Sequence, residues 1–362
     1  MIHFGAISQQ EFLTNYWQKK PLLIKQALPD FISPITADEL AGLSLENEFE
    51  SRLVQGNITT QQWSLNSGPF TENTFTSLSE KDWTLLVQGV DRFMPEVGSL
   101  ISHFDFIPRW RFDDVMISYA AKGGSVGPHF DYYDVFLLQG SGKRRWDLST
   151  KHCNINNYLK NAALRIMQKF EVEQSFEVEA GDVLYIPPKV AHHGVSLDDD
   201  CTTLSFGYRS YSCKEMFDES CPTDKQNIYY QDPVWNDSAA PALIPNSALK
   251  MANKIAHIDA ISFAKFVTKL DTLDQQIFQQ LEYQQYGFEF NPKAIYQLHS
   301  VCKVAYIKIN NKMHFFINGS SASTLDTDEQ SLINFCNQRL VNAATNPSLS
   351  QQLFNLNLVQ EV

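Results

Sequence analysis

The chain has 362 residues, of which 43% are hydrophobic and 19% charged, and its net charge is −12 at neutral pH. This is the composition of a globular protein of about two or three domains, and the negative charge argues against a nucleic-acid surface. No apolar run approaches the roughly 20 residues that span a bilayer, no signal peptide is recognisable, and the cysteines lack paired spacing, so we expect a cytoplasmic protein with free thiols and no membrane contact.

Residues 1–110 are predicted to form an α-rich lead-in to the first domain. Ser8 and Thr36 are predicted N-caps of two helices, and Glu39 completes a capping box with Thr36. The segment 80–93 is predicted to be a third helix, because Trp83, Leu86 and Val90 would share one face. Short strands are expected between these helices, at residues 21–25, 51–54 and 61–65.

From Asp113 onward the pattern changes to short strands separated by turn residues. The expected strands are 115–120, 135–138, 143–148, 175–178, 183–186 and 202–208, and residues 149–160 are expected to be an insertion or loop. Strands of this length and spacing are typical of a sandwich or barrel rather than of βαβ units.

The remainder of the chain is predicted to contain two further parts. Residues 211–278 are expected to hold a linker, at 218–245, and two short helices, at 247–255 and 259–270, which either mediate oligomerisation or pack on the barrel. In residues 279–362, two alternating strands joined by Asn310 and Asn311 predict a hairpin, and residues 326–340 predict a helix. This order resembles a winged helix, but it carries few basic residues, so we expect protein contacts rather than DNA binding.

Two motifs carry candidate metal ligands. The first is G-x5-H-x-D, from Gly123 to Asp131, and the second is G-x5-P-x-K-x2-H, from Gly181 to His192. They resemble the two cupin motifs, whose ligands point to the interior of one barrel, although Asp131 and Lys189 depart from the usual residues. Two histidines and one carboxylate form the facial triad of non-haem Fe(II) oxygenases. The motif spacing favours His192 over His193 as the third ligand.

A triad with open positions needs a co-substrate that can activate O₂, and 2-oxoglutarate would require a cation for its far carboxylate. Lys143, Arg144 and Arg145 follow a Gly-Ser-Gly turn. Strand alternation places Arg144 on one face and its two neighbours on the other, but it does not choose between the faces.

With DDVMIS, GPHFDYYDVFLLQGSGKRRW, GDVLYIPP and the lead-in WQKKPLLIK, the chain resembles the bacterial JmjC-type ribosomal oxygenases. The resemblance implies a mainly β catalytic domain (1–210) with a double-stranded β-helix, or cupin jelly roll. A helical dimerisation segment (211–278) and a winged-helix-like domain (279–362) would follow it. It also implies an Fe(II) enzyme that uses 2-oxoglutarate and O₂ to hydroxylate an arginine of a large-subunit ribosomal protein, with succinate and CO₂ as co-products.

The same resemblance implies a role for nine residues. The metal ligands would be His129, Asp131 and His192, the 2-oxoglutarate contacts Arg144 and Ser118, and the substrate contacts Asp114, Met116, Tyr133 and Ser205. Met116 and Ser205 are equally compatible with a place in the barrel core. The family also implies a homodimer, and the negative charge would suit a basic ribosomal substrate or simply keep the protein soluble.

Three other functions fit the same motifs. A histidine-directed ribosomal hydroxylase would share the metal and co-substrate motifs. A metal-dependent cupin that acts on a small molecule would have no need of Arg144. A binding protein without catalysis would use the barrel only as a scaffold, and the intact triad argues against it.

Overall fold

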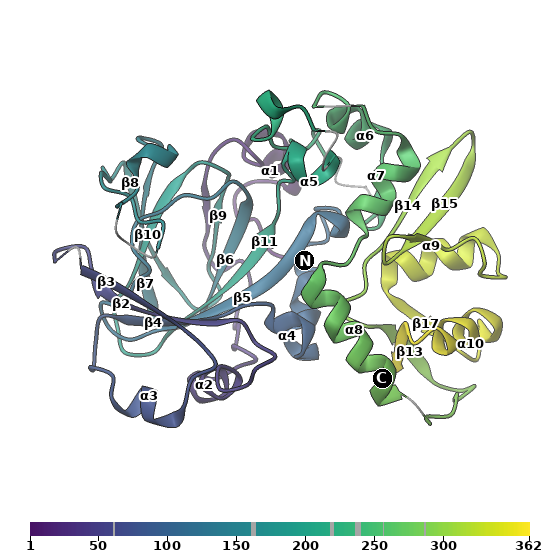
Figure 1. Ribbon diagram of the computed structural model, residues 1–362, viewed down its shortest axis with the longest axis horizontal. Coiled ribbons are helices and arrows are strands. Elements are labelled where there is room, and N and C mark those ends of the chain that lie inside the picture. Colours follow the sequence, from purple (N-terminus) through teal and green to yellow (C-terminus); the bar gives the residue numbers. More distant parts are fainter. Residues whose placement is uncertain (61, 161–163, 218–220, 236–239, 256, 286) are drawn as a thin grey trace. The chain divides into compact units, whose positions relative to one another are not determined.

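A computed structural model describes residues 1–60, 62–160, 164–217, 221–235, 240–255, 257–285 and 287–362 (Figure 1). They form two compact units. The first comprises Met1–Phe104 and Phe112–Arg209, and the second comprises Asp105–Arg111 and Ser210–Val362. Among the described residues, no helix has both the length and the apolar character needed to cross a membrane.

The first unit is built on two antiparallel sheets. An eight-stranded sheet has the order β1-β9-β6-β11-β5-β4-β2-β3, and a three-stranded sheet has the order β10-β7-β8. The strands are β1 (Leu22–Ile24), β2 (Ser51–Asn57), β3 (Gln62–Ser67), β4 (Trp83–Val87), β5 (Phe112–Ala120), β6 (Asp134–Ser141), β7 (Lys143–Ser149), β8 (Gln174–Glu179), β9 (Val183–Ile186), β10 (Ala191–Ser196) and β11 (Cys201–Tyr208). The predicted strands from residue 115 onward are therefore confirmed.

An apolar core fills the space between the two sheets. It consists of alternate residues from both: Val135, Leu137, Trp146, Leu148, Val178, Leu184, Ile186 and Val190. Because successive strand residues face opposite ways, this set also identifies which residues of β6, β7 and β9 point inward. The predicted jelly-roll architecture, mainly β with helices, is confirmed.

The outer face of the large sheet is covered by aromatic side chains from the lead-in. The ring of Phe12, on α1 (Gln9–Asn15), lies 5.0 Å from that of Tyr185, and Trp17 stacks on Phe136 at 5.9 Å. The predicted caps of α1 and α2 (Ala37–Leu43) are confirmed, since the Ser8 hydroxyl accepts from the Glu11 amide and Thr36 forms a capping box with Glu39. Both faces of β6 and β9 are thus buried.

The predicted helix at 80–93 is wrong. Trp83–Val87 is strand β4, between β2 and β5, and a single 3-10 turn, η1 (Val90–Arg92), follows it. A short apolar run fits both periods, and here pairing with two neighbouring strands decides in favour of a strand. The lead-in is accordingly less helical than expected: β2, β3 and β4 extend the large sheet. Its other helices are α3 (Glu72–Thr76), α4 (Pro95–Ser99) and η2 (Leu100–Phe104).

The second unit contains helices and two small sheets, of order β12-β14-β15-β16 and β17-β13-β18. Its helices are η3 (Arg109–Arg111), α5 (Cys213–Phe217), η6 (Thr223–Lys225), α6 (Asn246–Ala252), α7 (Ala260–Val267), α8 (Thr272–Gln285), α9 (Glu329–Gln338) and α10 (Pro347–Asn355). Its strands are β12 (Leu243–Ile244), β13 (Ile295–Leu298), β14 (Val304–Ile309), β15 (Lys312–Ile317), β16 (Ser320–Ser321), β17 (Leu340–Asn342) and β18 (Val359–Glu361).

The hairpin predicted in this unit is confirmed. β14 and β15 pair from Val304 with Ile317 to Ile309 with Lys312, and the turn residues Asn310 and Asn311 have φ of 49° and 62°. Asparagine tolerates these positive φ values better than most residues. The helix predicted at 326–340 is α9, but β17, α10 and β18 follow it and were not predicted. The expected linker at 218–245 lies partly outside the described residues, at 218–220 and 236–239.

His299 makes the stability of the protein depend on pH. Burial lowers the pKa of its imidazole to about 4, against an ordinary value of 6.5. Between these pH values the unfolded chain binds the proton and the folded chain does not, so this contribution to stability is lost as the pH falls from 6.5 to 4. We expect the loss to reach roughly 3 kcal/mol. Urea titrations of wild type and His299→Gln at pH 7 and pH 4.5 measure it; equal pH dependence of the two proteins would contradict the prediction.

Candidate metal centre

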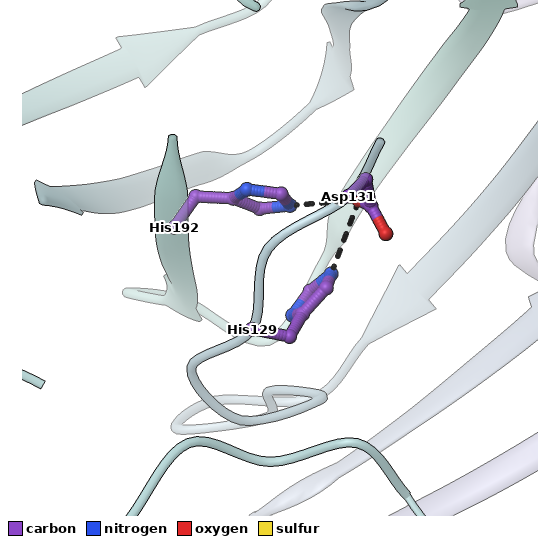
Figure 2. Close-up of side chains that lie close together, drawn as sticks. All are labelled: His129, Asp131 and His192. Carbon is purple, nitrogen blue, oxygen red and sulfur yellow. Dashed lines mark ion pairs between the residues drawn. The ribbon is translucent and has the colours of Figure 1, made fainter. Parts of the chain in front are cut away.

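Two side chains from the loop before β6, His129 and Asp131, and one from β10, His192, meet at one point (Figure 2). The potential ligand atoms of His129, Asp131 and His192 all lie within 4.8 Å of one another. The Nε2 atoms of the two histidines lie 3.8 and 3.6 Å from Oδ2 of Asp131, and the ring centroids are 4.2 Å apart. Two imidazole nitrogens and one carboxylate oxygen thus point toward one common position, at the spacing of metal ligands.

Backbone hydrogen bonds hold the two ligand segments together. The amide of His129 donates to the carbonyl of His192 at 3.1 Å, and the amide of His192 donates back at 2.8 Å. The amide of Lys189 donates to the carbonyl of Asp131 at 2.7 Å. The His-x-Asp motif forms only this isolated bridge and otherwise lies in the loop before β6. The loop orients both side chains through contacts with the second motif.

Both histidines are oriented as neutral ligands. Nδ1 of His129 lies 2.9 Å from the carbonyl oxygen of Gly127, and Nδ1 of His192 lies 3.1 Å from that of Val190. A carbonyl oxygen only accepts, so each Nδ1 carries the proton and each Nε2 presents its lone pair to the centre. Burial, followed by the neighbouring His129, lowers the pKa of His192 to about 4. His192 is therefore unprotonated at neutral pH and available to a metal.

His193, the alternative third ligand, points away from this centre. It follows His192 on β10 and faces the opposite side of the strand, where its ring lies 6.0 Å from the ring of Phe170. The next residue, Gly194, faces inward, and a Cβ there would come within 2.6 Å of the Trp146 ring. Of the two histidines, the structure brings only His192 to the cluster.

Arg144 is the basic residue of its triplet that points into the barrel. It is 3% exposed and shares the inner face of β7 with Trp146, whose ring lies 5.9 Å from that of His192. Lys143 is exposed, and the Arg145 side chain is 43% exposed and pairs with Asp147. Nε of Arg144 donates to Sγ of Cys201 at 3.3 Å, but its buried Nη2 has no hydrogen-bond partner among the residues that the structure describes. A buried guanidinium without a carboxylate is the arrangement expected of an anion site.

A polar chain inside the barrel continues from Arg144 toward Ser118. Cys201 also accepts from Nε2 of Gln139 at 3.3 Å, and the Thr203 hydroxyl donates to Oε1 of Gln139 at 3.0 Å. Ser118 is buried opposite Thr203 on the neighbouring strand. The sequence did not lead us to Gln139 or Cys201. For Gln139, the available signal was a polar residue directly after the apolar strand predicted at 135–138.

The predicted substrate residues gather at one side of this interior. Asp114 and Met116 are two residues apart on β5 and therefore face the same side of the sheet. Ser205, on β11, pairs with Met116, and both Asp114 and Ser205 are buried. Burial, followed by the charge of Asp113, raises the pKa of Asp114 to about 6. Tyr133 is 40% exposed, and the charge of Asp131 raises the pKa of its phenol well above the ordinary value.

The segment that carries these residues is similar to a known protein family. The protein-family model described as the JmjC domain matches residues 99–216, which include both motifs and Arg144. This part of the chain is therefore similar to a JmjC domain.

The chain is also similar to proteins that have been named. It is 40% identical over 232 residues to a probable ribosomal oxygenase of Haemophilus influenzae, and 38% identical over 241 residues to the ribosomal protein uL16 3-hydroxylase of Escherichia coli. These matches cover 64% and 66% of this chain but only 55% and 63% of the relatives. The chain thus spans less than two thirds of either relative's length. The predicted resemblance to JmjC-type ribosomal oxygenases is confirmed.

Solved structures match along nearly the whole chain. A structure of E. coli ycfD superimposes with a TM-score of 0.72 and 28% identity over 99% of both chains. A structure of YcfD in complex with cobalt and 2-oxoglutarate matches with a TM-score of 0.69 and 27% identity over 98% of both chains. The fold of this chain is therefore similar, along nearly its whole length, to that of a ribosomal oxygenase.

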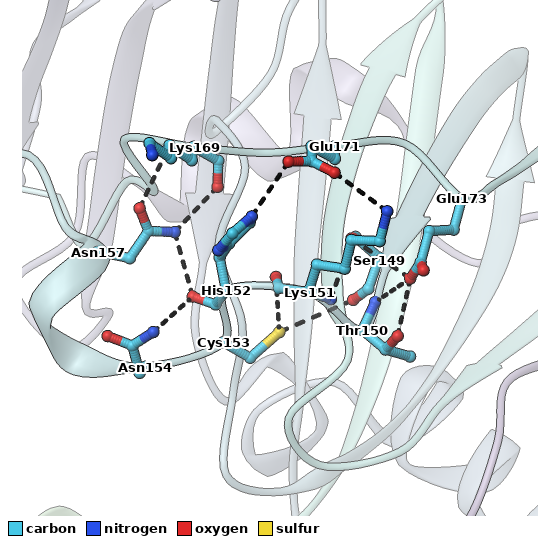
Figure 3. Close-up of polar contacts among 10 residues, drawn as sticks. All are labelled: Ser149, Thr150, Lys151, His152, Cys153, Asn154, Asn157, Lys169, Glu171 and Glu173. Atoms are coloured by element: carbon cyan, nitrogen blue, oxygen red, sulfur yellow. Dashed lines mark hydrogen bonds and ion pairs between the residues drawn. The ribbon is translucent and has the colours of Figure 1, made fainter.

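The loop that holds His129 and Asp131 is supported by an insertion between β7 and β8, here called the insertion loop (described residues 150–160 and 164–173; Figure 3). Polar contacts join its two ends: Lys151 and His152 pair with Glu171, Glu173 accepts from the Thr150 amide, and Asn157 bonds the backbone of Lys169 on both sides. The loop includes one 3-10 turn, η4 (Ile155–Asn157). These contacts fix a segment that would otherwise be a long unsupported connection.

The insertion loop contacts the residues on either side of the metal ligands. The Tyr158 ring stacks on Phe130 at 5.4 Å, and the amide of Met167 donates to the carbonyl of Pro128 at 2.8 Å. Phe130, between the two ligands His129 and Asp131, is 3% exposed and packs with Met167 and Ala191. The loop therefore buries the one non-ligand side chain of the His-x-Asp motif.

Replacing Tyr158 with alanine tests this support. Loss of the stacked ring is expected to reduce stability by about 2 kcal/mol and metal affinity by about 10-fold, because the ligand loop loses its packing surface. Urea unfolding and a Co(II) titration measure the two effects. Ile155→Ala is the matched control, since Ile155 is in the same loop and 68% exposed; equal Co(II) affinities for the two variants would refute the idea.

Proposed function

We propose that this protein is an Fe(II)- and 2-oxoglutarate-dependent oxygenase that hydroxylates an arginine side chain of a large-subunit ribosomal protein. The observation that carries the proposal is one interior holding three inward-facing ligands together with a buried guanidinium that lacks a carboxylate. His129, Asp131 and His192 supply the ligands, and Arg144 supplies the cation. A small-molecule cupin that does not use 2-oxoglutarate would have no need of a buried arginine whose guanidinium lacks a carboxylate partner.

The donor set fits iron. Two neutral imidazoles and a carboxylate without thiolate suit Fe(II), and Mn(II), Co(II) and Ni(II) fit the same ligands. When bound, the iron supplies the centre at which 2-oxoglutarate and O₂ react, so that one oxygen atom enters the substrate C–H bond and the other enters succinate, with release of CO₂. All other roles fall to the side chains of the barrel.

Within the barrel, Arg144 would receive the far carboxylate of 2-oxoglutarate, with Ser118 beside it. Nη2 of Arg144 is free to donate, and the Trp146 ring lies between Arg144 and His192, so the guanidinium is directed along the same interior. The apolar core around it excludes water, which strengthens a guanidinium–carboxylate pair. The YcfD structure that contains cobalt and 2-oxoglutarate supports this placement through its similar fold.

The substrate assignment rests on Asp114 and on the names of the relatives. A buried carboxylate suits a guanidinium better than a neutral imidazole, and Tyr133 and Met116 offer apolar surface to its aliphatic stem. The relative from E. coli is named a uL16 hydroxylase, and the net charge of −12 suits a basic ribosomal protein. A histidine-directed activity is the second candidate, since a Dictyostelium relative named as a histidyl-hydroxylase is 36% identical over 86 residues.

One experiment separates these functions. Purified protein is incubated with Fe(II), 2-oxoglutarate and ribosomal proteins, and succinate and the mass of each ribosomal protein are measured. A gain of one oxygen on an arginine of uL16 supports the proposal, and a gain on a histidine supports the second candidate. Absence of succinate formation under all conditions rejects both. The homodimer through α6 and α7 and the cytoplasmic location stay predictions.

A further inference from the structure

The carboxylate of Asp114 is held on one side only. Its Oδ2 accepts from Nε2 of Gln88 at 2.7 Å and from the amide of Gly89 at 3.0 Å. Its Oδ1 lies beside Gly207, where an added Cβ would be 3.6 Å from this oxygen. One oxygen is thus fixed by two donors, and the other lies next to a residue without a side chain.

The orientation of the Gln88 amide is determined by a second residue. Nη2 of Arg52, on β2, donates to Oε1 of Gln88 at 3.0 Å. A guanidinium has no acceptor, so Oε1 must face Arg52 and the NH₂ group must face Asp114. Strands β2, β4 and β5 are adjacent in the large sheet, and Gln88, the residue directly after β4, lies between Arg52 and Asp114 and bonds to both.

The surroundings of Asp114 make these donors necessary. Burial and the charge of Asp113 raise the pKa of the carboxyl group, whereas Arg92 and the hydrogen bonds from Gln88 and Gly89 oppose that rise. Asp91, whose own pKa is raised to about 7 by burial and by Asp114, is a second buried acid nearby. A carboxyl group among other acids stays ionised only where donors stabilise the charge.

We propose that Gln88, oriented by Arg52, is a positioning residue that sets the preference of the site for a cationic side chain. It holds Oδ2 of Asp114, so that the carboxylate remains ionised and turns Oδ1 toward the guanidinium of the substrate. This inference rests on the proposed function, in which Asp114 receives the substrate arginine. Gln88 acts through Asp114, and Arg52 acts through Gln88, although its Nη2 also lies 4.0 Å from Sδ of Met116.

The test is Gln88→Met, which keeps the length of the side chain and removes both hydrogen bonds. With purified uL16 as the probe, the KM for uL16 is expected to rise about 10-fold, because Asp114 loses one hydrogen bond to its charged group. The kcat and the KM for 2-oxoglutarate should change less than 2-fold. Arg52→Met should raise the KM for uL16 about 3-fold, and the double variant should match Gln88→Met, because Arg52 acts through Gln88. A KM of the double variant above that of Gln88→Met would instead assign the effect of Arg52 to its contact with Met116.

Gln55→Met is the control, an amide on the same strand as Arg52, and it should behave as wild type. A thermal melt of each variant detects loss of fold. If Gln88→Met is folded and its KM for uL16 equals that of wild type, the inference is wrong. If wild type hydroxylates no arginine, the proposed function fails instead, so the two failures are told apart by the wild-type reaction alone.

Discussion

Asp131→Ala is expected to lower the rate of 2-oxoglutarate turnover by at least about 1,000-fold. Asp131 supplies the only carboxylate of the three-residue cluster and contacts both histidines. Without it, two imidazoles remain, which bind a divalent ion more weakly and leave one of the three protein ligand positions on the ion unfilled. Removal of an outer partner of a ligand already costs 10- to 100-fold, and removal of a ligand is expected to cost more.

A measurement without catalysis checks the same change. Titration with Co(II), followed by its visible absorption, should show an affinity at least about 100-fold weaker in Asp131→Ala. The carbonyl of Asp131, which accepts from the Lys189 amide, is kept in the variant, so the loop should stay folded. Asp199→Asn, an exposed acid, is the control for lost charge. Wild-type Co(II) affinity in Asp131→Ala would exclude this cluster as the metal centre.

Arg144→Met is expected to raise the KM for 2-oxoglutarate by about 100-fold or more. A paired guanidinium and carboxylate in a buried site contribute two charged hydrogen bonds, each worth about 1.5–3 kcal/mol. The same variant should be more thermally stable than wild type, because it replaces a buried cation that has no carboxylate partner with an apolar chain. Lower activity together with a higher Tm is a result that mere damage to the fold does not produce.

Arg145→Met is the matched control for this prediction. Arg145 is the next residue on β7, its side chain is 43% exposed, and it pairs with Asp147 on the outer face. Its replacement should change the KM for 2-oxoglutarate less than 2-fold, since surface ion pairs contribute little. Steady-state succinate assays over a range of 2-oxoglutarate concentrations compare the two variants. Equal KM values would mean that Arg144 does not hold the co-substrate.

The sequence predicted the part of the protein in which local pattern and tertiary structure agree. Alternation and turn residues located the jelly-roll strands, and the two motifs located the three side chains that the structure brings together. The strand β4 was missed because Trp83, Leu86 and Val90 fit a helical period equally well, and only pairing with β2 and β5 distinguishes the two. Periodicity within one segment contains no information about its neighbours.

The interactions that hold the site residues in place could not be predicted from the sequence either. Alternation separated Arg144 from Lys143 and Arg145 but could not tell which face was inside, because that depends on how the two sheets pack. The relay from Arg52 through Gln88 to Asp114 joins residues that are 36 and 26 positions apart in the chain. The stacking of Tyr158 on Phe130 likewise depends on an insertion that looked like an ordinary polar loop.

The reciprocal amide bonds between His129 and His192 have a consequence for the order in which the protein acquires its metal. Because these backbone bonds, together with the packing of Phe130, hold the ligands without an ion, the free energy of ion binding is not consumed in ordering the chain, as it is in domains that fold only around their ion. The apoprotein should therefore be a stable species that takes up and releases ions reversibly. Its occupancy in the cell would then follow the supply of competing divalent metals, with Fe(II) retained by abundance rather than by affinity.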